Sequence, residues 1–145
     1  MRNKRKIIYW ILLILWMSMI AIMSNQPASI SDSQSLGVLN QLNSIGINIS
    51  NIFGDLSNFI IRKTAHFLEY MILGILIYNV LNFYFDKKQI FYIAVVLSAL
   101  YACTDEIHQF FVAGRECAFR DVVIDTCGAL CGVLIKKYLK VKSTV

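Results

Sequence analysis

The chain has 145 residues, 57% of them hydrophobic and only 16% charged, with a formal net charge of +5. Because a soluble domain carries about 25% charged residues, this composition disfavours a water-soluble fold, and its hydrophobicity excludes a disordered chain. The 7 Gly, 1 Pro and 4 Cys exclude collagen-like and disulfide-rich classes, and the length allows one domain over residues 1–145.

Four apolar runs approach the ~20 residues that an α-helix needs to cross a bilayer. They cover residues 7–23, 65–85, 90–112 and 122–139. The first run follows a basic N-terminus, as in a signal peptide, but its 17 uncharged residues exceed the usual hydrophobic core of such a peptide. We therefore expect a retained anchor and an all-α membrane protein with four transmembrane helices in one bundle.

The long connection after the first run is expected to form an interfacial helix. Aliphatic and aromatic residues recur along it at helical spacing, at Leu36, Leu39, Leu42, Ile45, Ile49, Ile52 and Phe53. A helix of this kind lies on the membrane surface with its apolar face in the acyl boundary.

The distribution of basic residues predicts the orientation in the cell membrane. With the N-terminus inside, 10 of the 14 basic residues fall on the cytoplasmic side, and the exceptions are Arg62, Lys63, Arg115 and Arg120. Four spans then place both termini in the cytoplasm. The same segregation indicates topology and not nucleic-acid binding, because the sequence has no basic stretch interleaved with aromatic residues and no zinc-finger spacing.

Acidic residues concentrate at the opposite end of the predicted spans. Of the nine, only Asp86 falls on the cytoplasmic side. Charged groups inside a membrane are costly and usually face a bundle interior or a wet cavity. Helical spacing puts Lys63, His66, Glu69 and Tyr70 on one broad face, Glu106 beside Gln109, and Asp121 and Asp125 in line with the small residues of a G-x-x-x-G motif, Gly128 and Gly132.

Several ordered blocks of this sequence resemble the VanZ family. They are residues 24–27 (SNQP), 62–70 (RKTAHFLEY), 105–115 (DEIHQFFVAGR) and 120–128 (RDVVIDTCG), and together they extend over nearly the whole chain. Ala113 stands where the family more often has Pro, and Asp125 stands where many members have Asn. The resemblance implies a small bacterial integral membrane protein. The family's namesake is associated with low-level resistance to the glycopeptide teicoplanin.

The family motif falls on residues that the spacing also singles out. We expect one site, open to the extracytoplasmic leaflet, in which the candidate catalytic residues are His66, Glu69, Glu106, Asp121 and Asp125, and the candidate substrate-binding residues are Lys63, Tyr70, Gln109 and Arg115. The expected partner is a membrane lipid or a lipid-linked envelope precursor, and a homodimer is a further option.

Three interpretations of this site stay open from sequence. In an enzyme, His66 would act as general base, a carboxylate would orient it, and Arg115 would hold a phosphate. In a non-catalytic protein, the same groups would bind or flip a lipid. In a structural protein, the buried ions would only fix helix packing.

No cofactor or metal is expected. His66-x-x-Glu69 and Glu106-x-His108 offer ligands that suit zinc or manganese, but neither is a known ligand spacing. The nearby cationic side chains would also oppose a metal ion.

Overall fold

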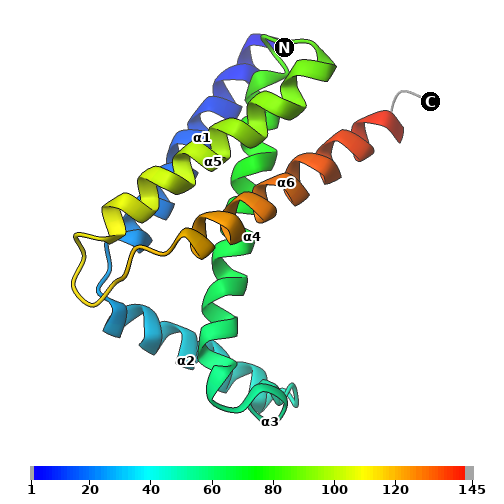
Figure 1. Cartoon of the computed structure of the whole chain (residues 1–145). Coiled ribbons are helices and arrows are strands. Elements are labelled where there is room, and N and C mark those ends of the chain that lie inside the picture. Colours follow the sequence, from blue (N-terminus) through cyan, green and yellow to red (C-terminus); the bar gives the residue numbers. More distant parts are fainter. Residues whose placement is uncertain (1, 143–145) are drawn as a thin grey trace.

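The computed structural model describes residues 2–142, which are all-helical and contain no strand. Met1 and residues 143–145 of the expected domain, which include both termini, lie outside the described residues. The helices are α1 (Arg2–Ser24), α2 (Ala28–Ser44), α3 (Ile49–Phe53), the short 3₁₀ helix η1 (Gly54–Leu56), α4 (Ser57–Leu81), α5 (Lys87–Gln109) and α6 (Phe119–Lys142) (Figure 1).

Three stretches of the described chain are long and apolar enough to cross a membrane. They are Asn3–Ser24 in α1, Ile49–Leu81, which ends with α4, and Lys88–Gln109 in α5. By length and composition, these stretches indicate a membrane protein. The fourth predicted span, residues 122–139, lies in α6, which is not among these candidate stretches. It is long enough, but Asp125, Lys136 and Lys137 fall within the predicted span, so the four-span bundle stays a prediction.

The helix ends differ from the boundaries of the predicted spans. The span predicted at 65–85 corresponds to α4, which begins earlier, at Ser57, because Arg and Lys are good helix formers and the helix continues through Arg62 and Lys63. It also ends earlier, at Leu81. The chain turns at Asn82, and the apolar residues 83–85 continue this turn to Asp86, the residue before α5. The limits of an apolar run therefore do not fix where the helix begins or ends.

The predicted span 90–112 shows the same effect at its far end. Helix α5 stops at Gln109, and the three apolar residues that follow are held in turns by backbone hydrogen bonds. The chain then reverses at Gly114, whose φ of 73° suits glycine and strains other residues. This turn carries Arg115 back toward the other helices.

Helix α4 is the central element of the fold. It packs most extensively against α6, and also against α1, α2 and α5. The core that it shares with them contains fully buried apolar side chains such as Leu73, Ile90 and Val133. In Figure 1, α1 and α5 lie alongside each other while α6 crosses α4.

The crossing of α4 and α6 depends on glycine. A Cβ atom built at Gly128 would lie 2.2 Å from the Phe67 carbonyl oxygen, and one built at Gly132 would lie 2.0 Å from that of Met71. The G-x-x-x-G spacing therefore lies on the face of α6 that meets α4, as the sequence predicts. Since both contacts are with backbone, the two helices approach more closely than side chains would allow.

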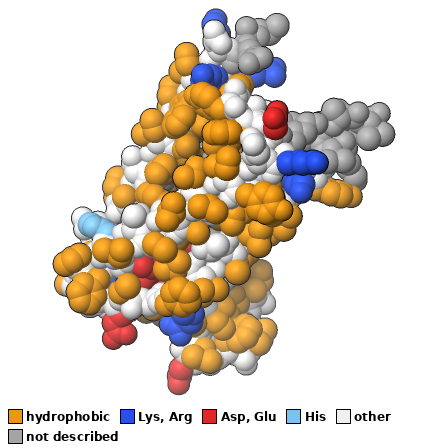
Figure 2. Space-filling model, turned by 45° about the horizontal axis from the view of Figure 1, so that its top comes forward, with side chains coloured by type: hydrophobic (Ala, Val, Ile, Leu, Met, Phe, Trp, Pro, Cys, Tyr) orange, Lys and Arg blue, Asp and Glu red, His pale blue; other side chains and the backbone are white. Residues whose placement is uncertain are grey.

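The segment predicted to form one interfacial helix is divided between α2, which ends at Ser44, and the short α3 and η1. Leu39, expected on its membrane-facing side, is buried, and the interfacial position of the segment stays a prediction. Helix α2 lies across the end of the bundle where α4 begins (Figure 1). It exposes Ile30, Leu36 and Val38, and the connection after it exposes Ile45 and Ile47. On the face in Figure 2, hydrophobic side chains cover most of the middle, and charged side chains gather toward the two ends.

Candidate functional site

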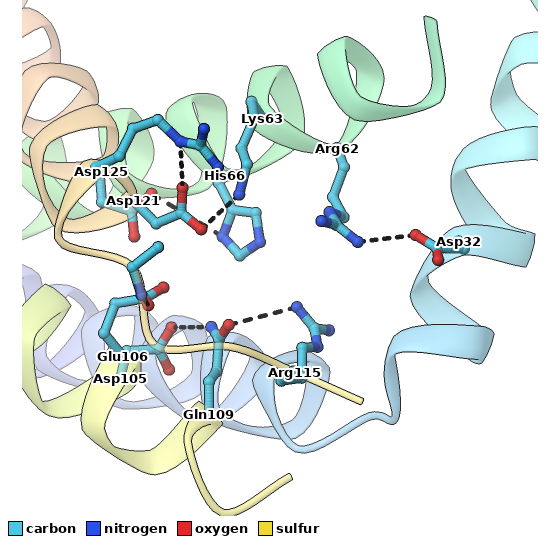
Figure 3. Close-up of polar contacts among 12 residues, drawn as sticks. Asp32, Arg62, Lys63, His66, Asp105, Glu106, Gln109, Arg115, Asp121 and Asp125 are labelled. Carbon is cyan, nitrogen blue, oxygen red and sulfur yellow. Dashed lines mark hydrogen bonds and ion pairs between the residues drawn. The ribbon is translucent and has the colours of Figure 1, made fainter. Parts of the chain in front are cut away.

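The crossing of α4 and α6 brings together basic and acidic side chains one to two turns before the glycine contacts. Lys63 Nζ donates to Asp121 Oδ2 at 2.5 Å, and this pair is largely shielded from solvent. His66 Nδ1 lies 3.9 Å from Asp125 Oδ1. Figure 3 shows Lys63 and His66 pointing toward the two aspartates. The acidic stripe of α6 therefore faces the bundle interior.

His66 lies between two carboxylates. Besides Asp125, Glu69 Oε2 lies 4.0 Å from its Nδ1, one helical turn along α4. Neither distance is a hydrogen bond, and within residues 2–142 Nδ1 and both Asp125 oxygens have no hydrogen-bond partner. The Asp125 side chain is only 1% exposed. Such groups are costly to bury, so this cluster is an unusual feature of the fold.

Helix α5 contributes a second set of polar groups. Gln109 Nε2 donates to Asp105 Oδ2 at 3.0 Å, one turn back along the helix. Glu106 accepts a hydrogen bond on Oε2 from the Ala118 backbone N–H at 3.0 Å, while its Oε1 has no partner in the described chain. Glu106 thus anchors the segment that leads into α6.

Arg115 is held between α5 and the turn after α1. Its Nε donates to the Gln26 carbonyl oxygen at 3.2 Å, and its Nη1 donates to Gln109 Oε1 at 3.4 Å. Partial burial, with Arg62 acting in the same direction, lowers the pKa of the Arg115 guanidinium from its ordinary value. An arginine with a lowered pKa is still charged at neutral pH.

A cavity of about 170 Å³, which we call the Arg115 cavity, lies among these groups. Its walls come from α1, α2, α4, α5 and the turn after α5. The polar side chains that line it are Ser24, Gln26, Ser31, Gln34, Ser35, Arg62, His66, Glu69, Asp105 and Arg115. Arg62 also donates to Asp32 of α2 at 2.8 Å, which ties α2 to the wall of the cavity (Figure 3).

A second cavity, of about 140 Å³, lies on the other side of Arg62 and Arg115, which line both. Four basic residues line it, namely Arg62, Lys63, Arg115 and Arg120, and its acidic residues are Glu116 and Asp121. The two cavities therefore form one region with cationic groups at its centre.

The structure brings most of the predicted site residues to this region. Those that line one cavity or the other are Lys63, His66, Glu69, Gln109, Arg115 and Asp121. Tyr70, Glu106 and Asp125 line neither of them and are almost fully buried behind. Tyr70, expected to bind substrate, packs in the core with its ring 6.2 Å from that of Tyr101.

Several residues that line the cavities are not among the predicted site residues. Asp105 has a helical signal, because it precedes Gln109 by four residues, and Arg62 belongs to the family block 62–70 and directly precedes Lys63. Ser31, Gln34 and Ser35 of α2 repeat at three- and four-residue steps, which is the spacing of a polar helix face. This polar face is hard to recognise in the sequence, because the apolar residues of the same segment show a stronger helical spacing.

Within residues 2–142, no three His, Cys, Asp or Glu side chains are grouped so that they could hold a metal ion. A helical chain with three stretches able to cross a membrane, and an ionic cluster at one end of its bundle, is a membrane protein with a polar site. The chain belongs to the VanZ/LLP1 family, whose sequence profile matches residues 9–140, nearly the whole chain. Comparisons with curated proteins and with solved structures found no match.

Proposed function

We propose that this protein binds the phosphate-bearing headgroup of an envelope lipid, or of a lipid-linked cell-wall precursor, at the extracytoplasmic face of a bacterial membrane. The observation that carries the proposal is the environment of Arg115. Lys63 and Arg62 are paired with Asp121 and Asp32. In contrast, both side-chain hydrogen bonds of Arg115 within the described chain go to neutral oxygens.

An arginine held by neutral acceptors keeps its positive charge available. The planar guanidinium presents donors in a fork that matches two oxygens of a phosphate. Arg115 lines both cavities, so an anion at either one lies within reach of it. A headgroup that carries hydroxyl or amide groups finds further partners in Ser31, Gln34 and Ser35 on the α2 wall.

The proposed orientation places this site at the outer leaflet. In a four-span topology with α1, α4, α5 and α6 as the spans, the basic residues at the N-terminus, at the start of α5 and at the end of α6 lie in the cytoplasm. The Arg115 turn then lies outside, and α2 lies along the outer interface. The exposed aliphatic side chains of α2 support that position.

If the protein is an enzyme, His66 is the proposed general base. It lines the Arg115 cavity, and its Nδ1 lies within 4.0 Å of carboxylate oxygens of Glu69 and Asp125. An imidazole oriented by a carboxylate is suited to remove a proton from water or from a headgroup hydroxyl. Binding or flipping of the lipid without a reaction is the alternative function of the same site.

Purely structural ion pairing is the second alternative, and the Lys63–Asp121 and Arg62–Asp32 pairs favour it. In that case the charged side chains only fix α4 against α6 and α2. A role in susceptibility to glycopeptides follows from the family's namesake and is a separate prediction, to be tested by teicoplanin sensitivity of a deletion strain.

Native mass spectrometry of gently extracted protein tests the proposal. We expect the wild type to retain a phosphate-bearing lipid, and Arg115→Ala and Glu106→Gln to lose it while membrane abundance stays near normal. Lys88→Ala, at the opposite end of α5, is the matched control and should retain the lipid. Equal lipid occupancy in Arg115→Ala and wild type would contradict the proposal. Loss of folded protein in both site variants would favour structural ion pairing.

A further inference from the structure

An apolar groove of about 650 Å³ runs between α1, α4 and α5. We call it the α1–α4–α5 groove. Its walls include Met17 of α1, Ile77 and Leu81 of α4, and Leu97 and Leu100 of α5. Almost all of this lining is hydrocarbon. At one end lie Trp10 and Tyr84, where the indole N–H donates to the phenol oxygen at 2.9 Å, and at the other end lies Thr104.

The Thr104 end of the groove leads to the polar site. Tyr101 and Thr104 also line a smaller cavity of about 170 Å³, together with Ala21, Asp105 and His108. Asp105 in turn lines the Arg115 cavity. Successive turns of α5 therefore pass from the apolar groove to the polar site, and Leu97 and Asp105 are about 12 Å apart along the helix.

We propose that the α1–α4–α5 groove holds a hydrocarbon chain of the same lipid whose headgroup binds at Arg115. This inference rests on the proposed function and narrows the ligand to an intact lipid, as opposed to a water-soluble headgroup or precursor fragment. The groove lies on the three helices that are apolar enough to span a membrane, so hydrocarbon surrounds it.

The direction of the groove matches that of a lipid. If the headgroup binds at the outer end, the acyl chain of the lipid lies along α5 toward the middle of the bilayer. The groove extends in the same direction, from Thr104 to Leu97. Tyr101 lies at the junction, where its hydroxyl donates to the Met17 carbonyl oxygen at 2.7 Å. This bond holds the Tyr101 ring at the junction, where it lines both the groove and the smaller cavity.

Photo-crosslinking tests the inference in vesicles that contain phosphatidic acid with a diazirine at the middle of one acyl chain. We expect adducts to concentrate on Met17, Leu97 and Leu100. Leu100→Trp fills the groove and should reduce these adducts to the level found on the rest of the lipid-facing surface. Val96→Trp is the matched control, because Val96 is exposed on the same helix and does not line the groove. The control should retain the wild-type adducts.

Arg115→Ala tests whether the groove and the headgroup site bind the same lipid. We expect this variant to lose both the groove adducts and the retained lipid. The inference would be overturned if adducts were spread evenly over the groove and the exposed surface of α5 around Val96. It would also be overturned if groove adducts persisted in Arg115→Ala, or if a protein dimer excluded lipid from the groove. The proposed headgroup site would survive these outcomes, provided that native mass spectrometry still shows lipid loss in Arg115→Ala.

Discussion

At the scale of residues, the buried ionisable groups differ in how far they are paired. Lys63 and Asp121 form a direct ion pair whose side chains are 11% and 15% exposed. Asp125 and Glu106 keep carboxylate oxygens without a hydrogen-bond partner in residues 2–142. A fold that needed charges only for packing would be expected to satisfy them, so the unsatisfied oxygens support a role in binding or proton transfer.

The Lys63–Asp121 pair gives a prediction for stability. Asp121→Ala leaves the Lys63 ammonium largely buried without a counter-charge, and we expect this to lower the free energy of unfolding by about 3 kcal/mol. Adding Lys63→Met removes the stranded charge and should restore most of the loss. Denaturant titration in detergent micelles measures both variants. A double variant that is no more stable than Asp121→Ala would show that the lost ion pair is not the cause.

At the scale of elements, the α4–α6 crossing determines the geometry of the site. The glycine contacts hold the two helices backbone to backbone, and the ion pair and His66 lie just before these contacts along both helices. The two helices run in the same direction past each other, since Phe67 meets Gly128 and Met71 meets Gly132. Any change that separates them would also separate His66 from Asp125.

Gly128→Ala tests this crossing. The new Cβ atom would lie 2.2 Å from the Phe67 carbonyl oxygen, so the helices must move apart, and overpacking of this kind costs about 1–3 kcal/mol. Gly37→Ala is the control, because Gly37 lies in α2 with nothing within 4 Å of the new atom. There alanine should stabilise the protein by up to ~1 kcal/mol. Thermal unfolding in detergent compares the two, and equal effects would contradict the close approach.

At the scale of the whole molecule, the polar site and most of the basic residues lie at opposite ends of the predicted spans. The groove with Trp10 and Tyr84 extends toward the basic end, and the Arg115 cavity lies toward the other. A single orientation in the membrane therefore fixes which leaflet supplies the ligand.

Cysteine labelling tests the orientation. Cys117 is exposed in the connection before α6, and the other three cysteines, which lie in α5 and α6, can be replaced by Ala. A membrane-impermeant maleimide should label Cys117 on intact cells. In a background without cysteine, Lys88→Cys should react only after permeabilisation. The reverse pattern would place the Arg115 turn in the cytoplasm and overturn the outer-leaflet site.

Sequence spacing predicted what is local to one helix. The faces of α4 and α6 that carry Lys63, His66, Asp121 and Asp125 follow from helical periodicity, and so does the glycine contact. Family resemblance is confirmed over residues 9–140.

What spacing could not predict depends on packing between distant segments. The contact of Arg62 with Asp32, and of Arg115 with Gln26, joins parts of the chain that no periodicity relates. The depth of Tyr70 is set by Tyr101, which belongs to another helix. The ends of α4 and α5 also differ from the predicted spans, because residues 83–85 and 110–112 are apolar and yet lie in turns.

The backbone contact between α4 and α6 separates the positions of the site residues from their identities. Because the nearest atoms at Gly128 and Gly132 are backbone atoms of α4, backbone contact largely sets the distance between the two helices at the crossing, and with it the spacing of positions 63, 66, 121 and 125. Exchange of a carboxylate for an amide at position 125 would thus change the charge of the site without changing the backbone positions around it. Relatives built on the same crossing could diversify their ligands by point substitution alone, without redesign of the scaffold.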